Sequence, residues 1–182
     1  MIRKRLNTET AILEAAFEIF GKNPGASLSD VAELAGVGRA TLHRHFAGRD
    51  ELIRALARNA MDELDAAVDE AVKGAPSYTE GLRLALEAML PLASRQMFLA
   101  TEAAAQTGDI AERIQSDFDE LVRDVKKAQA EGGLRKEVPA EWFARAYENL
   151  IYAGWEMVRN EEATSKQAAD FAWGLLSEGA KA

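Results

Sequence analysis

Residues 39–45 gather side chains whose chemistry suits the recognition of nucleic acid. Arginine can donate two hydrogen bonds to a guanine edge, alanine and threonine methyl groups can contact thymine, and hydroxyl or imidazole groups can reach phosphates. If Leu42 is the residue of this short segment that faces inwards, its neighbours face solvent. The outward residues that we expect to bind DNA are Arg39, Ala40, Thr41, His43, Arg44 and His45.

The preceding residues have the pattern of a helix-turn-helix that would position this segment. Ser27, with Asp30 three residues later, forms a variant capping box that begins a helix. Ala32 is small enough for a close helix crossing, Gly36 stands where the turn needs a positive φ, and Val37 fills the corner. The second helix of such a motif enters the major groove of DNA. The alanine-to-glycine spacing by itself also fits an ordinary helical hairpin with a solvated basic face.

The composition excludes several kinds of chemical site. There is no cysteine, which removes disulfides, thiolate metal sites and a cysteine nucleophile. The two histidines both lie in the segment described above, so the Glu-x-x-His pairs of a di-metal helical bundle are missing. The sequence has neither a glycine-rich phosphate loop nor a nucleophile motif. We therefore expect no enzyme, no cofactor and no metal site.

Charge is distributed unevenly along the 182 residues. The net charge of −8 by itself disfavours nucleic-acid binding. Residues 1–58, however, carry nine basic and seven acidic side chains, whereas residues 59–182 carry 13 and 23. The N-terminal third can therefore present a DNA-binding face, while the acidic remainder serves solubility. Because no window approaches the ~18 apolar residues of a membrane span and no apolar run follows the basic start, we expect a cytoplasmic protein.

Helical periodicity and cap signals run along the whole chain, which predicts an all-α fold of about nine helices. Apolar residues at helical spacing, such as Leu13, Phe17 and Phe20, indicate a core-facing stripe in the first helix. We expect a three-helix DNA-binding domain over residues 1–48 and a helical ligand-binding and dimerisation domain over residues 49–182. The helices are expected near residues 8–21, 27–35, 39–45, 49–72, 77–90, 94–106, 109–131, 139–160 and 164–177.

The segment from Ser27 to Leu52 closely resembles the tetracycline-repressor (TetR) family. It reads SLSDVAELAGVGRATLHRHF followed by AGRDEL, and the upstream run AILEAAF with Phe20 is similar as well. The resemblance is strong over about residues 8–56 and architectural beyond them. It implies a homodimeric transcriptional regulator, usually a repressor, that binds operator DNA and is released by a small-molecule ligand.

The resemblance also implies roles for individual residues. Ser27 matches the helix cap whose hydroxyl and amide groups often contact phosphate, and residues 39–41 match the start of the recognition helix. Arg49 matches the family's usual lysine, a phosphate contact at the start of the fourth helix. Two residues depart from the family pattern. Gly38 replaces a serine, which weakens the helix cap, and His43 replaces a tyrosine, which shortens its reach to phosphate and makes a contact pH-dependent.

The last two predicted helices carry wide apolar stripes, and in the TetR family such helices pair with their copies in a four-helix bundle. Gly154 lies in mid-helix, where glycine costs about 1 kcal/mol relative to alanine, so a close helix crossing would justify it. The same stripes also fit an intramolecular core. The residues expected at the dimer interface are Phe143, Leu150, Gly154, Val158, Phe171 and Leu175.

A ligand pocket is expected among the fourth to eighth helices. Methionine and aromatic side chains suit an adaptable, mostly apolar cavity in which a few polar groups orient the ligand. We therefore expect a small, largely hydrophobic effector, although each of these residues also fits plain core. The alternative is a dimeric DNA-binding protein with no small-molecule effector. The residues expected to bind the ligand are Met61, Met89, Met97, Phe98, Glu102, Phe118 and Tyr147.

Overall fold

Helices account for most of the chain that the structure describes. The computed structural model describes residues 7–92, 94–95, 98 and 108–179. These residues form eight α-helices and one 3-10 turn without a strand, which confirms the all-α class. The helix expected over residues 94–106 lies mostly outside them. The elements are α1 (Thr8–Lys22), α2 (Leu28–Leu34), α3 (Arg39–His45), α4 (Arg49–Ala71), α5 (Tyr78–Met89), η1 (Leu90–Leu92), α7 (Gly108–Ala130), α8 (Ala140–Arg159) and α9 (Ser165–Gly179).

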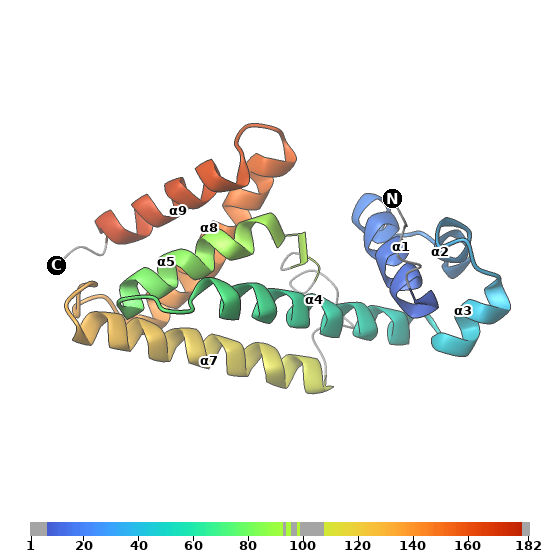
Figure 1. The fold of residues 1–182 in the computed structure, drawn as a ribbon, viewed down its shortest axis with the longest axis horizontal. Helices are drawn as coiled ribbons and strands as arrows, with labels where there is room; N and C mark the ends of the chain where they lie inside the picture. Colours follow the sequence, from blue (N-terminus) through green and yellow to red (C-terminus); the bar gives the residue numbers. More distant parts are fainter. Residues whose placement is uncertain (1–6, 93, 96–97, 99–107, 180–182) are drawn as a thin grey trace.

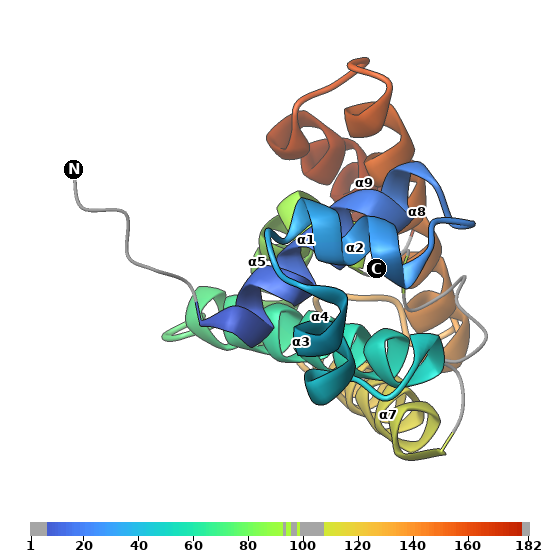
Figure 2. The same cartoon turned by 90° about the vertical axis from the view of Figure 1, so that its right-hand side faces the viewer.

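The first three helices lie together at one end of the molecule, and α4 connects them to the remaining helices (Figure 1). Figure 2 views the molecule from that end, with α2 and α3 toward the viewer. The 23 residues of α4 extend for about 35 Å at 1.5 Å per residue, long enough to reach both groups. Beyond α3, α5 packs on α4, α7 and α9, and α8 packs on α7 and α9. None of the described helices is both long and apolar enough to cross a membrane.

Two hydrophobic cores stabilise these two groups of helices. The first joins α1, α2 and α3 to α4 and includes Leu42, Phe46 and Leu56. The second lies among α5, α7, α8 and α9, and Met89 packs against both cores. The first core extends along α4 as far as Leu64, beyond the boundary expected at residue 48 between the two domains.

Local signals in the sequence account for the ends of these helices. Asn7 caps α1, since its side-chain oxygen accepts a 2.9 Å hydrogen bond from the Glu9 N–H. Ser77 caps α5 in the same way, accepting from the Glu80 N–H at 3.1 Å. Gly132 follows α7 with a φ of 87°, the left-handed conformation in which glycine commonly ends a helix. These contacts join residues close in sequence, so the helix boundaries could be predicted well.

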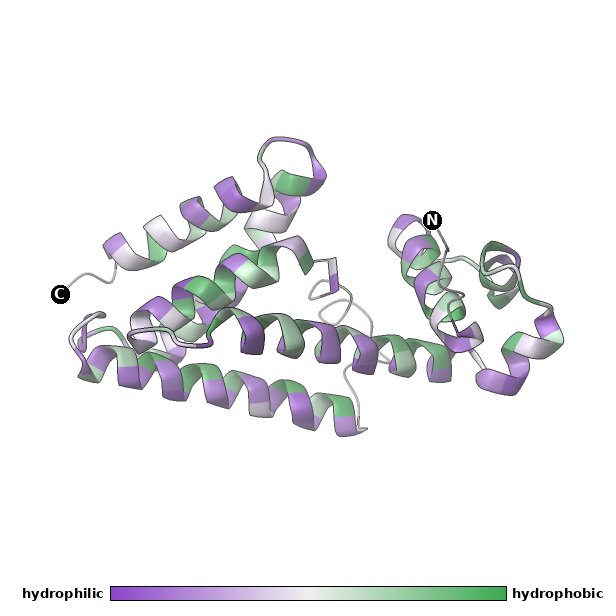
Figure 3. Ribbon diagram, viewed as in Figure 1, coloured by the Kyte–Doolittle hydropathy of each residue, from purple (hydrophilic) through white to green (hydrophobic). Residues whose placement is uncertain are grey.

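Ion pairs join the middle of α4 to the first half of α7. Arg58 of α4 donates two hydrogen bonds to the Asp109 carboxylate, at 3.0 and 3.2 Å. Arg113 of α7 donates to Asp62 at 2.8 Å and to Asp65 at 2.5 Å. Hydropathy colouring shows both helices with hydrophilic and hydrophobic residues interspersed (Figure 3). Each exposed pair adds about 0–1 kcal/mol to stability, but together they fix the register of α4 on α7.

Candidate nucleic-acid interface

The turn between α2 and α3 has the backbone conformation that its sequence requires. Gly36 has a φ of 68°, in the left-handed region that favours glycine. The Val37 N–H donates a 2.9 Å hydrogen bond to the Ala32 carbonyl oxygen and closes the corner. Ala32 and Leu42 are both buried in the first core, which α2 and α3 share. The two helices therefore form a helix-turn-helix, as predicted.

One side of α3 is basic and open to solvent. Leu42 is 1 % exposed and is the single buried residue of this seven-residue helix. The N-cap Gly38 makes no side-chain hydrogen bond, as expected of glycine at this position. Thr41 is half-buried. The predicted DNA-binding residues of α3 that are exposed are Arg39, Ala40, His43, Arg44 and His45.

Ser27 and Asp30 form a reciprocal capping box at the start of α2. The Ser27 N–H and hydroxyl group donate to one Asp30 carboxylate oxygen at 2.8 and 2.9 Å, and the Asp30 N–H donates to the Ser27 hydroxyl oxygen at 3.3 Å. Two hydrogen bonds hold the pKa of Asp30 below its ordinary value. The bond from the Ser27 N–H has the larger effect, and the bond from the Ser27 hydroxyl group has the next largest. Both Ser27 donors are thus already paired, so the phosphate contact predicted for this residue requires an exchange of partners.

The guanidinium group of Arg49 is bound to backbone oxygens of its own chain. Nη1 donates to the Ala26 carbonyl oxygen at 2.7 Å, and Nη2 donates to the Pro24 carbonyl oxygen at 2.6 Å. The guanidinium carbon also lies 4.2 Å from the centre of the Phe20 ring, within the range of a cation–π interaction. The family resemblance implies a phosphate contact for Arg49, whereas the structure shows two of its N–H donors engaged by the loop between α1 and α2.

This helix-turn-helix lies within a segment that matches a family of DNA-binding proteins. Residues 12–56 match the model of bacterial regulatory proteins, tetR family. Over 157 residues the chain is 32 % identical to the HTH-type transcriptional repressor LfrR of Mycolicibacterium smegmatis. The matched region covers 86 % of this chain and 82 % of LfrR. The chain belongs to the TetR family. The resemblance noted in the sequence is therefore confirmed.

Solved structures extend the TetR likeness over nearly the whole chain. The crystal structure of the TetR-like regulator LfrR from Mycobacterium smegmatis in complex with proflavine has a TM-score of 0.77 at 29 % identity, covering 96 % of this chain and 98 % of that one. AibR in complex with isovaleryl coenzyme A and operator DNA has a TM-score of 0.82 at 22 % identity, covering 94 % and 98 %. The C-terminal helices of this TetR regulator therefore share the fold of these proteins as well.

Large apolar side chains are exposed on α8 and α9 of this TetR regulator. Phe171 and Leu175, one turn apart on α9, are 54 % and 68 % exposed. Trp142 and Tyr152 of α8 are 71 % and 42 % exposed. Neither Trp142 nor Tyr152 was expected at an interface, because both lie outside the stripe that packs on the second core. Large aromatic residues at positions off the core-facing stripe are the sequence signal that could have identified them.

Two residues predicted at the dimer interface instead face their own chain. Phe143 is buried in the second core. A Cβ atom added at Gly154 would lie 2.7 Å from Leu90 Cδ1 and 3.4 Å from Ala168 Cβ. Within the single chain, the close approach that requires this glycine is therefore to η1 and α9. The other interface residues predicted on α8, Leu150 and Val158, are half-buried against the second core.

The residues predicted to bind ligand are divided between the two cores. Met61 is buried in the first core, and Tyr147 is buried in the second. Burial raises the pKa of Tyr147, and its hydroxyl group donates to the Leu82 carbonyl oxygen at 2.7 Å. That hydroxyl is thus engaged within the protein. Half-buried Met89 lies where the cores meet. Two further predicted residues, Met97 and Glu102, lie outside the described residues.

The two phenylalanines predicted to bind ligand pack against other side chains. Phe98 meets Phe17 of α1 edge to face, with ring centres 5.3 Å apart. The Arg95 guanidinium lies 4.0 Å from the centre of the same Phe17 ring, so this part of the chain contacts the N-terminal helices directly. Phe118 lies 4.2 Å from the guanidinium of Arg145. Both rings are half-buried, and each has a side chain of the same chain packed against it.

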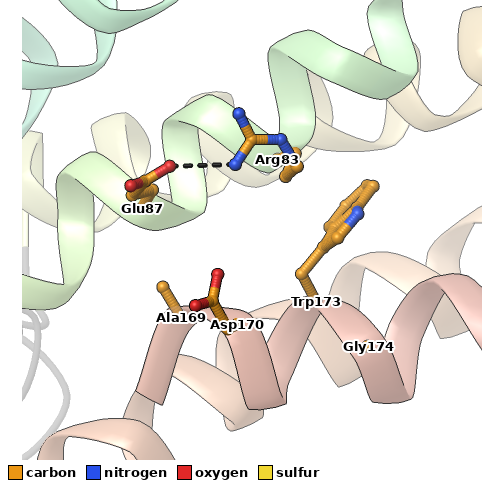
Figure 4. Close-up of a pocket in the computed structure, with 6 residues that line it drawn as sticks. All are labelled: Arg83, Glu87, Ala169, Asp170, Trp173 and Gly174. Carbon is orange, nitrogen blue, oxygen red and sulfur yellow. Dashed lines mark hydrogen bonds and ion pairs between the residues drawn. The ribbon is translucent and has the colours of Figure 1, made fainter. Parts of the chain in front are cut away.

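Two hollows on the described surface are lined by other residues. One, of about 120 Å³, lies between α5 and α9 (Figure 4). Within it, Arg83 forms ion pairs with Glu80 and Glu87 at 2.8 and 2.9 Å, so its charge is largely balanced. The other is an open depression lined by residues of α7. The first is well below the 300–1,000 Å³ usual for a ligand pocket. The lining of the first hollow consists of Arg83, Glu87, Ala169, Asp170, Trp173 and Gly174.

Proposed function

We propose that this TetR-family chain is a homodimeric repressor that binds operator DNA through α3 and is released by a small, mostly apolar effector. The observation that carries the DNA-binding proposal is the orientation of α3. Its seven residues turn one leucine into the core and keep the basic and polar side chains accessible, behind a helix-turn-helix corner. A helix held in this way enters the major groove, where residues 39–41 lie nearest the base edges.

The charge distribution supports this orientation on DNA. The excess of acidic residues lies in residues 59–182, which reach the end of the molecule remote from α3 (Figure 1). Repulsion from phosphates is therefore concentrated away from the proposed binding face, which retains Arg39 and Arg44 as exposed basic groups. Ser27 and His43 are additional phosphate contacts in this proposal. Operator binding would place the protein's action in the bacterial cytoplasm.

The proposed dimer uses the exposed apolar side of α8 and α9. Phe171 and Leu175 are large and more than half exposed in the single chain, so a second copy would remove considerable apolar surface from water. On α8, the exposed side chains of Trp142 and Tyr152 would also be covered in this dimer. A twofold dimer would present two α3 helices to two half-sites, about one DNA turn apart or a multiple of it.

Two relatives support the proposal that a small-molecule effector acts on this chain. LfrR has been crystallised with proflavine, and AibR with isovaleryl coenzyme A and operator DNA. In the present chain, α4 begins at the DNA-binding domain and is bound by ion pairs to α7. An effector that separates α4 from α7 would shift α4, and with it the spacing of the two α3 helices. The pocket that we propose for it lies around Met61, Met89, Phe118 and Tyr147.

DNA binding is tested by selecting an operator duplex from random DNA and measuring its affinity for the full-length protein at several salt concentrations. Two copies of the proposed face should make roughly 6–10 phosphate contacts, so log K should fall with log salt with a slope of about −5 to −9. Failure to recover a sequence, or a flat salt response, would contradict the proposal.

The effector proposal is tested by thermodynamic reciprocity. Compounds that raise the melting temperature are titrated into the protein with and without the operator duplex. If a compound lowers operator affinity a hundredfold, about 2.7 kcal/mol, the operator must lower its affinity for the protein by the same factor. Equal affinities in both titrations would favour the alternative, a dimeric DNA-binding protein with no small-molecule effector.

A further inference from the structure

Arg49 is the first residue of α4, at the point where α4 meets the loop between α1 and α2. Its two terminal nitrogens donate to two different carbonyl oxygens of that loop, Pro24 at 2.6 Å and Ala26 at 2.7 Å. Its guanidinium group also lies over the ring of Phe20 near the end of α1. Two hydrogen bonds to different acceptors and a ring beside the guanidinium group together restrict its position and its tilt.

The loop that Arg49 holds carries α2. Ala26 is buried and is followed directly by the N-cap of α2. Asn23 shapes the same loop, because its side-chain oxygen accepts from the Gly25 N–H and its carbonyl oxygen accepts from the Ala26 N–H, each at 3.0 Å. The next helix, α3, packs on α2. A displacement of residues 24–26 would therefore displace α2, and with it the proposed DNA-reading helix.

We propose that Arg49 is a positioning residue for operator binding: it ties the start of α4 to the loop that carries α2 and α3, and it makes no phosphate contact of its own. This inference rests on the proposed function, because it assumes that α3 binds an operator. It assigns to Arg49 a role different from the one implied by the family's lysine at this position. It also identifies a route by which a shift of α4 reaches α3.

The chemistry of the side chain explains why arginine suits this role. A guanidinium group presents several N–H donors in a rigid plane, so it can bind two acceptors while its face rests on an aromatic ring. A lysine ammonium is a compact, strongly hydrated charge on a flexible stem, and it lacks the flat face that covers Phe20. Lysine therefore suits a phosphate contact, whereas two carbonyl oxygens and a ring together select arginine.

The salt dependence of operator affinity distinguishes a positioning residue from a phosphate ligand. Arg49→Met and Arg44→Met remove the same charge by the same substitution, one from the loop contact and one from the exposed side of α3. Arg49→Met should lower operator affinity about tenfold and leave the slope of log K against log salt unchanged. Arg44→Met should make that slope about 2 units less steep, because a dimer loses two phosphate contacts.

Two further measurements separate positioning from a loss of folding. Circular dichroism must show each variant to be folded at the assay temperature. Hydrogen exchange should then be faster at the backbone amides of Ala26 and Ser27 in Arg49→Met but not in Arg44→Met. If Arg49→Met does not fold, Arg49→Lys serves instead. Arg49→Lys keeps the positive charge of the wild type, but its operator affinity should stay below that of the wild type.

The possible failures of this experiment are distinguishable. If the wild-type protein has no operator or a flat salt response, the proposed function fails. If the wild type binds but Arg49→Met reduces the salt slope as much as Arg44→Met, Arg49 is a phosphate ligand and the inference is overturned. Wild-type affinity in Arg49→Met or in Arg49→Lys would overturn it as well.

Discussion

The hydroxyl group of Tyr147 on α8 donates a 2.7 Å hydrogen bond to the carbonyl oxygen of Leu82 on α5, inside the second core. The two residues are 65 positions apart in sequence, so this bond ties α8 to a helix from the other half of the chain. Tyr147→Phe should lower the free energy of unfolding by about 1 kcal/mol, the usual net worth of one such bond. This corresponds to a melting temperature about 2–4 °C lower.

Tyr152→Phe is the matched control for that measurement. Its exposed hydroxyl group makes a 3.3 Å bond to Glu156 on the same helix, so its removal should change stability by about 0.5 kcal/mol or less. Equal melting temperatures for Tyr147→Phe and the wild type would show that the bond to Leu82 contributes nothing.

Substitutions on α3 should weaken operator binding without unfolding the protein. Arg39→Ala and Thr41→Ala each remove a proposed base contact, which should cost about 1–3 kcal/mol of operator affinity. Because neither side chain belongs to the core, stability should change by about 0.5 kcal/mol or less. Arg123→Ala removes an exposed arginine from α7 and should bind the operator as the wild type does. Wild-type affinity in both α3 variants would mean that α3 does not read DNA.

Two mid-helix glycines should respond oppositely to alanine. At Gly154 a Cβ would come within 2.7 Å of Leu90 Cδ1, and Leu90 is itself buried, so overpacking of about 1–3 kcal/mol should outweigh the gain in helix propensity. At Gly174 a Cβ would meet nothing within 4 Å, so alanine should stabilise α9 by about 0.5–1 kcal/mol. Thermal unfolding of the two variants measures both effects. A stabilised Gly154→Ala would contradict the packing described here.

A charge placed on the outer side of α9 should dissociate the proposed dimer. Leu175 is 68 % exposed in the single chain, and an aspartate there would have to be desolvated if a second copy covered it. Leu175→Asp should therefore yield monomers by light scattering and should lose high-affinity operator binding. Leu34→Asp, at an exposed leucine of α2, should remain dimeric. A dimeric Leu175→Asp would place the interface elsewhere.

The capping box of α2 should make a pH-dependent contribution to stability. The hydrogen bonds from Ser27 lower the pKa of Asp30 from its ordinary value of 3.8. A carboxyl group whose pKa is lower in the folded state stabilises the fold above its unfolded pKa, and this contribution is lost as the pH falls through the folded pKa. Asp30→Ala should therefore melt below the wild type at pH 7, and the difference should close as the pH falls below 3.8.

Asp69→Ala controls for the loss of a negative charge in that pH series. Asp69 is an exposed residue of α4 whose carboxylate makes no hydrogen bond within the described part of the chain. Its melting curve should follow that of the wild type from pH 7 to pH 3. A constant gap between Asp30→Ala and the wild type across that range would mean that the Asp30 charge plays no part in the cap.

The elements of the DNA-binding domain could be predicted because their signals are local. The bonds between Ser27 and Asp30 span three residues, and the turn depends on the conformation of Gly36 and on a bond from Val37 to Ala32, five residues earlier. The burial of Leu42 follows from its position in a short helix with polar neighbours. Side-chain chemistry and helical periodicity therefore determine the helix ends, the inward residue of α3 and its basic exposed side, without knowledge of distant partners.

Tertiary structure decided which neighbour each buried or charged group meets. An apolar stripe indicates that a residue is covered but not by what, so Phe143 and Gly154 were expected to face a second copy and instead face their own chain. Likewise, an arginine at position 49 can bind a phosphate or a carbonyl oxygen. Which acceptor Arg49 binds depends on the loop between α1 and α2, 23–25 residues earlier in the sequence. The carbonyl oxygens of that loop come within bonding distance only when α1 and α4 have packed together. Sequence determines the chemistry that a side chain offers, whereas packing determines which partner lies within bonding distance.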